Sequence, residues 1–393
     1  MKILHTADWH LGAALGTARR YEEFDKVLAF LLNVIREQQV ECVIIAGDVF
    51  DTPQPSNRAV EQYYSFLTDC ARSGVKHCIV LAGNHDSPSF LEAPGRLLQL
   101  LNVHVFARWQ TPEEHLVPLD GAVVAAIPFL HDRDVRSAIS GETYEDRLRA
   151  VQTGTAAIYQ AAADAAERLY PGVPLIGTGH FWAVDRKEYN ALEQVGNLSA
   201  LPLDLLPMDK FAYLALGHIH GSYAVDKYPN ARYSGSILPM TFAEHEKQLV
   251  LLDTDNLDEP QFIDIPQFRK LVEISGDMDT IAAQIATLKQ CGMDVLLKVE
   301  HTGAFLPHLQ KELLELCKDS SIILNSCRNR EPNPAILHRT NVTETLSTLT
   351  PEMVFMRLLK EQDLPEEEQK DLLDVFRIAV RDMENAQREE QAQ

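Results

Sequence analysis

The sequence contains few cysteines: six among 393 residues, with no CxxC pair among them. Without paired cysteines the chain offers neither the ligands of a zinc ribbon nor the framework of a small disulfide-rich domain. We therefore interpret the cysteines as small apolar residues of a protein in a reducing compartment.

Long hydrophobic runs are also missing. Apolar runs such as Val43–Ala46 and Leu249–Leu252 are far too short to span a bilayer, and MKILHTADWH at the N-terminus lacks the apolar core of a secretory signal. We expect a cytosolic or nuclear protein with no membrane partner. At 46% hydrophobic and 24% charged residues the composition is that of a folded protein, and the length predicts two or three domains.

Positive charge is scarce. Lysine and arginine number 36 against 57 acidic residues, a formal net charge of −21. This balance argues against a generally basic coat of the kind that binds nucleic acid. It leaves room for a local basic strip, or for a site made positive by bound metal ions.

Strand-like and helix-like segments alternate up to about residue 265. The helical periods cover Tyr21–Glu37, Ala59–Arg72, Phe90–Leu101 and Tyr144–Leu169. The strand-like runs are Lys2–His5, Cys42–Ala46, Cys78–Ala82, Val123–Ile127, Leu175–Gly179 and Tyr213–Leu216. The alternation predicts a layered α/β domain over residues 1–265 whose strands are largely parallel.

The remainder divides at proline pairs. Residues 266–335 alternate strand, helix, strand, helix and strand, which predicts a small α+β domain of its own. After Pro332 and Pro334 an acidic tail, residues 340–393, carries helical patterns over about Thr350–Glu361 and Pro365–Ala386.

Metal-capable side chains follow five of the predicted strands. They form the groups DWH, GDVFD, GNHD, GH and GHIH, which contain carboxylates, imidazoles and one amide but no thiolate. Loops at the carboxyl ends of strands in an open α/β sheet converge on one crevice. Each group alone is weak, because a lone DxH is usually chance and GNHD could be a simple turn. Together, and in this order, they predict a site for two divalent metal ions.

These five motifs resemble the signature of the calcineurin-like metallophosphoesterases. The wider motifs are similar to one branch of that family, SbcD, the nuclease subunits of bacterial double-strand-break-repair complexes. These motifs are HTADWHLG, AGDVFD, LAGNHDS, GTGH, ALGHIH and YSGSILPMTF. The resemblance implies a layered metallophosphoesterase sandwich of β-sheets flanked by helices, a small α+β capping domain and a C-terminal helical tail. Beyond residue 265 it is one of architecture only.

The resemblance also implies a role for each motif residue. One Mn²⁺ would be bound by Asp8, His10, Asp48 and His220. The other would be bound by Asp48, Asn84, His180 and His218, so that Asp48 bridges the two ions. His85 would be a catalytic histidine that binds no metal, with Asp51 orienting its ring.

Three residues near these motifs allow two readings each. Asp86 would bond loop amides or order the residues behind the metals. Phe181 and Trp182 depart from the branch, and local packing is favoured over a stacking contact with DNA. The last motif, YSGSILPMTFAEHE, also differs from the branch, because Ala243 and then Glu244 follow the final phenylalanine where an aspartate is usual.

The leading hypothesis is an Mn²⁺-dependent nuclease with 3′→5′ exonuclease activity on duplex ends and endonuclease activity on single strands and hairpins. It would work with an SbcC-type, SMC-like ATPase in the cytoplasm, associated with the nucleoid. The alternatives are a phosphoesterase for small molecules or phosphoproteins, and a structural subunit that binds DNA ends with vestigial metals. The acidic charge predicts weak DNA binding by the chain alone.

Two assembly surfaces follow from the helical patterns. Apolar stripes in Ala59–Arg72 and Phe90–Leu101 match the region that dimerises in this family, which predicts a homodimer and a heterotetramer with the ATPase. The alternative is that both stripes only cover the sheet. The apolar tail helices would dock on the ATPase, unless they pack back on their own domain.

Overall fold

The computed structural model describes residues 1–136, 142–194, 200–331, 355–356, 372–373 and 375–376. The chain forms two compact units: Met1–Thr302 with His308–Arg328, and Gly303–Pro307 with Asn329–Gln393. Among the described residues, no helix is long and apolar enough to cross a membrane. The boundaries 1–265, 266–335 and 340–393 stay predictions.

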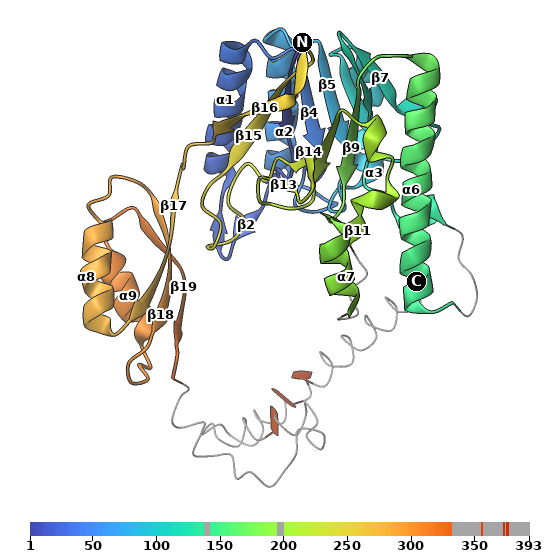
Figure 1. Cartoon of the computed structure of the whole chain (residues 1–393). Coiled ribbons are helices and arrows are strands. Elements are labelled where there is room, and N and C mark those ends of the chain that lie inside the picture. Colours follow the sequence, from blue (N-terminus) through green and yellow to red (C-terminus); the bar gives the residue numbers. More distant parts are fainter. Residues whose placement is uncertain (137–141, 195–199, 332–354, 357–371, 374, 377–393) are drawn as a thin grey trace. The chain divides into compact units, whose positions relative to one another are not determined.

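Two six-stranded sheets form the centre of the first unit (Figure 1). The first has the order β16 (Asn256–Asp264), β15 (Gln248–Asp253), β1 (Lys2–Thr6), β4 (Cys42–Ala46), β5 (His77–Leu81) and β6 (Val103–Phe106). The second has the order β13 (Tyr223–Val225), β14 (Tyr228–Tyr233), β12 (Tyr213–Gly217), β9 (Leu175–His180), β8 (Ala122–Ala125) and β7 (Leu116–Leu119).

Alternating side chains place these sheets face to face. In β4, Ile44 and Ala46 point into a core shared with Ile176 of β9 and Ala215 of β12. The alternate residues, Val43 and Ile45, point to the opposite side. Both faces of the strand are therefore buried, which explains its unbroken apolar run CVIIA. This contact between sheets makes the sandwich.

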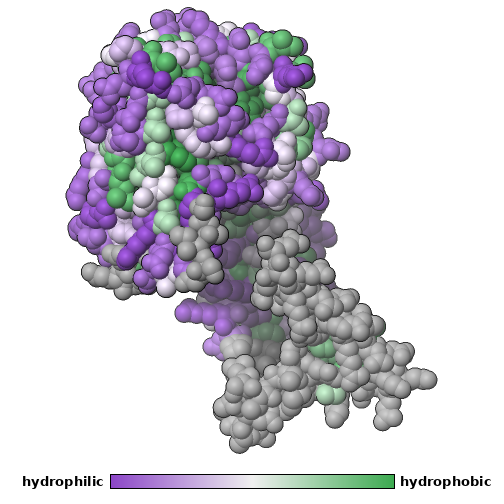
Figure 2. All heavy atoms as spheres, turned by 90° about the vertical axis from the view of Figure 1, so that its right-hand side faces the viewer, coloured by the Kyte–Doolittle hydropathy of each residue, from purple (hydrophilic) through white to green (hydrophobic). Residues whose placement is uncertain are grey.

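Helices cover the two outer faces. Helices α1 (Tyr21–Gln38) and α2 (Asn57–Arg72) pack on the first sheet, and α6 (Tyr144–Leu169) packs on the second. Figure 2 shows the side of the molecule that carries α6, which is mainly hydrophilic with scattered hydrophobic patches. The layered sandwich expected from the sequence is confirmed.

The structure corrects one local expectation. The predicted helix Phe90–Leu101 is two short helices, α3 (Pro88–Glu92) and α4 (Gly95–Gln99), because Pro94 lacks the amide needed to continue the first.

The largely parallel order of the predicted strands is confirmed: β1 pairs in parallel with β4, β4 with β5, β8 with β9, and β9 with β12. The antiparallel pairs involve strands that the sequence patterns did not single out, with β15 against β1 and β16, β7 against β8, and β13 against β14.

Smaller elements complete this unit. The strands β2 (Ala14–Leu15) and β3 (Ala18–Arg19) form a short antiparallel pair, and β10 (Ala183–Val184) and β11 (Leu201–Pro202) a short parallel one. The remaining short helices are α5 (Asp132–Val135), α7 (Arg186–Gln194) and the 3₁₀ turns Glu113–His115, Leu203–Leu205 and Met208–Lys210.

The predicted α+β segment has the expected order of elements. A three-stranded sheet contains β17 (Lys270–Gly276), β18 (Val295–His301) and β19 (Ile322–Asn329), with helices α8 (Met278–Leu288) and α9 (Leu309–Cys317) between them in sequence.

Most of the predicted tail helices, Thr350–Glu361 and Pro365–Ala386, lie outside the described residues. The described tail residues, 355–356, 372–373 and 375–376, are helical. The rings of Phe355 and Phe376 stack with their centroids 4.1 Å apart. At least one pair of tail side chains therefore packs within the tail.

Candidate metal centre

The predicted ligands come from the ends of strands in both sheets. Asp8 and His10 follow β1, Asp48 follows β4, and Asn84 follows β5 in the first sheet. His180 ends β9, and His218 and His220 follow β12, in the second sheet. Because the strands β1, β4 and β5 run parallel, as do β9 and β12, their carboxyl ends meet at one edge of the sandwich.

Close contacts join these side chains around two buried carboxylates. Asp8 and Asp48 are 0% and 2% exposed. Asp48 Oδ2 lies 3.2 Å from His180 Nε2 and 3.5 Å from His10 Nε2. Single ligand atoms from Asp8, Asp48 and His180 all lie within 4.8 Å of one another, and the same is true of Asp8, His10 and His220.

Two further contacts extend these groups. His10 Nε2 is 3.2 Å from His220 Nε2. Asn84 Oδ1 is 3.1 Å from His180 Nε2 and 3.0 Å from His218 Nδ1. All seven predicted ligands are thus brought together, with several of their ring nitrogen and oxygen atoms facing one another.

The backbone at the site is strained in a consistent way. Asp8, His10, Asp48 and His218 have positive φ angles of 52°, 46°, 50° and 96°. The left-handed region costs non-glycine residues free energy, and such residues persist where the surrounding structure and function require them. Four of the seven predicted ligands carry this cost.

Neighbouring glycines let the loops approach closely. An added Cβ at Gly47, whose φ is +92°, would lie 2.2 Å from His180 Nδ1, and one at Gly83 would lie 2.1 Å from Asp48 Oδ1. Any larger residue at either position would displace a predicted ligand.

The electrostatics favour positive charge in this crevice. Burial alone would lower the pKa of His180, but the adjacent Asp48 and Asp8 raise it to about 9. Burial opposes ionisation of Asp48 as well, yet His180 and His10 hold the pKa of its carboxyl well below the usual value. The pKa of Asp8 is raised, chiefly by burial. Two buried carboxylates facing imidazole nitrogens and an amide oxygen fit divalent cations, which would compensate the carboxylate charge.

Comparisons with known proteins agree with this geometry. Residues 1–222, more than half of the chain, match the family model of the calcineurin-like phosphoesterases, and residues 267–363 match the type 5 capsule protein repressor C-terminal domain.

Three curated relatives are all named as the SbcD component of the SbcCD nuclease. The relative from Escherichia coli K12 is 32% identical over 391 residues, which cover 96% of this chain and 97% of that protein. The relative from Rhodobacter capsulatus is 33% identical over 285 residues (68% and 70%), and that from Bacillus subtilis 168 is 30% identical over 260 residues (64% and 66%). The chain belongs to the SbcD family.

SbcD membership supports a metal-dependent phosphoesterase and nuclease subunit, and it implies divalent metal ions. The sequence-based recognition of this family is therefore confirmed. The roles of the individual residues are not settled by membership and depend on the geometry around each one.

His85 lies at the open edge of this SbcD site, with an exposed ring. Its Nδ1 is 2.9 Å from the backbone carbonyl oxygen of Asp51, and its backbone N–H donates to Asp48 Oδ1 at 2.9 Å. The sequence suggested that the Asp51 carboxylate orients His85. In the structure the main-chain carbonyl of Asp51 contacts His85, and the Asp51 carboxylate lies 3.4 Å from His10 Nδ1 and within 4.8 Å of a ring nitrogen of His85.

The ring of His85 stands edge-on to that of His10, with 4.8 Å between the ring centroids. Ligand atoms of His10, Asp51 and His85 also lie within 4.8 Å of one another. His85 is therefore adjacent to the candidate ligands, close enough to reach a phosphate that the metals would hold.

Asp86 binds the backbone of two neighbouring loops. Its buried carboxylate accepts hydrogen bonds from the backbone N–H groups of Val49, Phe50 and Gly83 at 2.9–3.0 Å. Burial raises its pKa to about 6 despite these donors. The side chain therefore ties the loop after β4 to the loop after β5, the first of the two arrangements that the sequence allowed.

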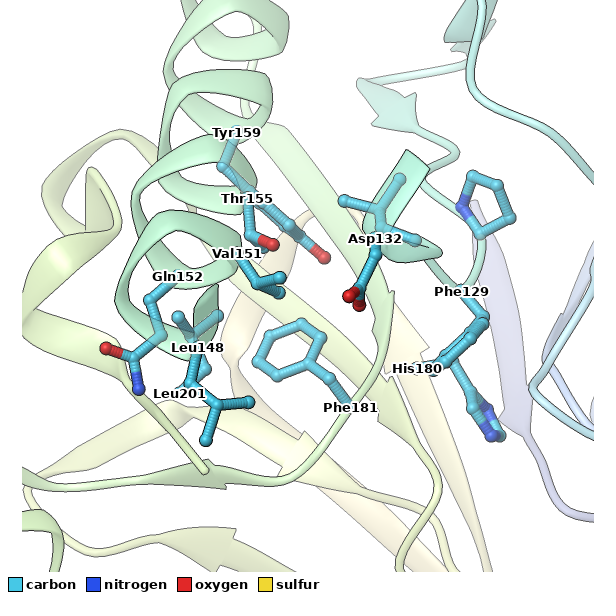
Figure 3. A pocket seen from close by; sticks show the side chains of 12 residues that line it. Phe129, Asp132, Leu148, Val151, Gln152, Thr155, Tyr159, His180, Phe181 and Leu201 are labelled. Atoms are coloured by element: carbon cyan, nitrogen blue, oxygen red, sulfur yellow. The ribbon is translucent and has the colours of Figure 1, made fainter. Parts of the chain in front are cut away.

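Phe181 and Trp182 separate in the structure. Trp182 packs against the cluster of Val184, Tyr189 and Ala200, as expected for local packing. Phe181 also packs locally, edge-on against Tyr159 of α6 with 5.9 Å between the ring centroids. In addition it lines a cavity of about 220 Å³ beside His180, with Leu148, Val151 and Leu201 among the other lining residues (Figure 3). Most of the lining is apolar, so the cavity suits a flat apolar ring better than a phosphate.

Two charged residues near His220 were not assigned from the sequence. Glu244 Oε1 lies 3.8 Å from His220 Nδ1, and Lys247 is 5% exposed although it is a lysine. The signal that could have found them is the end of YSGSILPMTFAEHEK, which puts three charged residues, Glu244, Glu246 and Lys247, directly after a motif that has no charge.

Proposed function

We propose that this chain is the two-metal DNA nuclease subunit of an SbcCD-type complex. It would hydrolyse phosphodiesters as a 3′→5′ exonuclease on duplex ends and as an endonuclease on single strands and hairpins, together with an SbcC-type ATPase. The observation that carries the proposal is the convergence of seven metal-capable side chains, from both sheets, on the buried carboxylates of Asp8 and Asp48.

The contacts support a division of the ligands into two sets. Asp8, His10 and His220 form one close group, and Asp48 and His180 form the other together with Asn84 and His218. Asp48 contacts both His10 and His180, so it is placed to bridge two ions. When bound, two Mn²⁺ ions would neutralise charge on the phosphodiester and make water a stronger nucleophile at neutral pH.

His85 is the candidate proton donor. Its Nδ1 is engaged by the Asp51 carbonyl, which leaves Nε2 as the nitrogen available to the substrate. From there His85 would stabilise developing charge or protonate the leaving 3′ oxygen. Its exposed ring beside the buried His10 leaves it open to the substrate.

The curated relatives favour DNA over a small phosphoester. Each is named as part of a nuclease, and the Escherichia coli protein aligns over nearly its full length. With a net charge of −21 the chain is expected to bind DNA weakly by itself, and the ATPase would supply most of the affinity.

Replacing His85 separates catalysis from metal binding. His85→Asn should keep two bound Mn²⁺ but lower nuclease activity by about 10²–10⁴-fold, the usual contribution of a general acid. Asp48→Ala should lose both ions. Metal content by inductively coupled plasma mass spectrometry and cleavage of labelled duplex DNA measure the two effects.

His104→Asn is the matched control, because His104 stacks on His77 in the first sheet away from the predicted ligands. The assignment of roles is wrong if folded His85→Asn loses its metals, or if it cleaves DNA as fast as the parent.

Phe181 is the side chain we propose for stacking on a nucleobase of the cleaved strand. It follows the candidate ligand His180 and lines the apolar cavity beside it. Phe181→Ala should weaken binding of single-stranded DNA by about 1–3 kcal/mol, as loss of one stacked base does. Fluorescence anisotropy in Ca²⁺ measures this, with Phe262→Ala as the control for an exposed phenylalanine. Equal affinity of Phe181→Ala and the parent would assign Phe181 to packing.

A homodimer is proposed on a smaller surface than the sequence indicated. In α2 the stripe of Ala59, Tyr63, Phe66 and Leu67 is buried in the chain's own core, so it is not a dimer surface. Leu97 and Leu100 of the α4 region remain 64% and 80% exposed. Light scattering of the chain at micromolar concentration should give a dimer, and the double variant Leu97→Glu/Leu100→Glu a monomer. A monomeric parent would contradict the proposal.

The tail is the proposed docking element for the ATPase. Of its described residues, Leu372 and Val375 are 43% and 63% exposed, so the Phe355–Phe376 stack leaves apolar side chains uncovered. Deleting residues 345–393 should abolish co-purification with the ATPase and ATP-stimulated duplex cleavage, while Mn²⁺-dependent cleavage of bis-p-nitrophenyl phosphate survives. A truncated chain that still assembles at full strength would place the docking site elsewhere.

A further inference from the structure

The segment Tyr233–Lys247 connects the end of β14 to the start of β15 and lies directly behind His220. Its sequence, YSGSILPMTFAEHEK, contains none of the seven candidate metal ligands. Its polar groups nevertheless converge on one residue of the metal centre, which calls for a physical explanation.

Lys247 makes three hydrogen bonds with its ammonium group, although it is only 5% exposed. Nζ donates to the backbone oxygen of His220 at 2.7 Å, to Ser236 Oγ at 2.8 Å and to Glu244 Oε2 at 2.5 Å. A buried ammonium is costly unless all its donors are used, and here all three are. Lys247 thus joins the loop of His220 to the segment that follows.

The backbone carbonyl of His220 is enclosed from a second direction. Its oxygen also accepts the backbone N–H of Ser236 at 3.1 Å. An added Cβ at Gly235, whose φ is +77°, would lie 2.7 Å from the same oxygen. The YSGS turn therefore needs glycine in order to wrap this carbonyl, and it leaves His220 little freedom to move along the chain.

Glu244 faces the ring of His220. It accepts the backbone N–H of Met240 at 3.1 Å and the hydroxyl of Thr241 at 3.2 Å, besides the bond from Lys247. These contacts hold Oε1 at 3.8 Å from His220 Nδ1. Three groups other than the His220 ring therefore hold the carboxylate in place.

Two of the other three histidines among the candidate ligands show what such a partner does, whereas His218 turns its Nδ1 toward Asn84. His180 Nδ1 is engaged by the carbonyl of Ala46 at 2.9 Å, and His10 Nδ1 faces the Asp51 carboxylate at 3.4 Å. A group behind Nδ1 keeps the proton there, turns Nε2 toward the metal and makes it a better donor. Glu244 occupies that place for His220, whose Nε2 points at His10 Nε2.

We propose that Glu244 and Lys247 are a positioning pair for His220, in which Lys247 fixes the His220 backbone and Glu244 orients its ring. This inference rests on the proposed two-metal function and adds that one of the two metal positions, that of Asp8, His10 and His220, depends on a charged pair outside the ligand set. The pair acts on the metals only through His220.

Glu244→Gln tests the pair most cleanly. The amide keeps the size of the side chain and can still accept from Met240 and Lys247, but it removes the charge that faces His220. Titration of the full-length chain with Mn²⁺, followed by the electron paramagnetic resonance signal of the free ion, measures both sites. We expect one site to keep the parent affinity and the other to weaken by about 10–100-fold. The thermal midpoint of the metal-free chain should stay close to that of the parent.

Two further variants separate orientation from general stability. Glu246→Gln removes an exposed carboxylate two residues away and should bind Mn²⁺ as the parent does. Lys247→Met keeps the Glu244 side chain but removes the ammonium group that binds both Glu244 and the His220 backbone. It should therefore weaken the same single site.

The possible outcomes are distinct. Unchanged affinity at both sites in Glu244→Gln would overturn the proposal. So would equal weakening of both sites with a lower midpoint of the metal-free chain, because the pair would then only stabilise the fold. If the parent chain itself does not bind two Mn²⁺ ions, the proposed function fails, whatever the variants do.

Discussion

Two carboxylates buried side by side at the edge of the sandwich are the constraint on which the rest of this structure depends. Asp8 and Asp48 are almost without solvent contact, and their ligand atoms share one crevice with that of His180. Buried like charges are unstable unless positive charge compensates them. The surrounding imidazoles, the strained backbone angles and the close glycines bring the candidate ligands of a positive ion next to these two carboxylates.

The two sheets divide this task between them. The first sheet contributes both carboxylates, His10 and Asn84, and the second contributes His180, His218 and His220. The sheets meet closely at this edge: an added Cβ at Gly217, the last residue of β12, would lie 2.0 Å from the Ala46 oxygen at the end of β4. Packing between the sheets therefore also sets the distances within the metal centre, so core and site cannot vary independently.

Sequence patterns predicted the features that depend on neighbouring residues. The helical period predicted the bounds of α6 correctly, and its start is fixed by the Thr143 cap with Asp146. The strand-end motifs predicted which side chains would converge. Contacts between distant segments could not be predicted in this way. Three such contacts are the approach of the Asp51 carboxylate to His10, the burial of the α2 stripe and the approach of Glu244 to His220. Each depends on how segments far apart in sequence meet.

A crystal of the chain soaked in Mn²⁺ and measured near the manganese absorption edge tests the central claim most directly. The anomalous difference map should show two peaks about 3.5–4 Å apart, the spacing of two-metal sites, with the Asp48 carboxylate between them. One peak should lie against Asp8, His10 and His220, and the other against Asn84, His180 and His218. A single peak, or two peaks without Asp48 between them, would contradict the account.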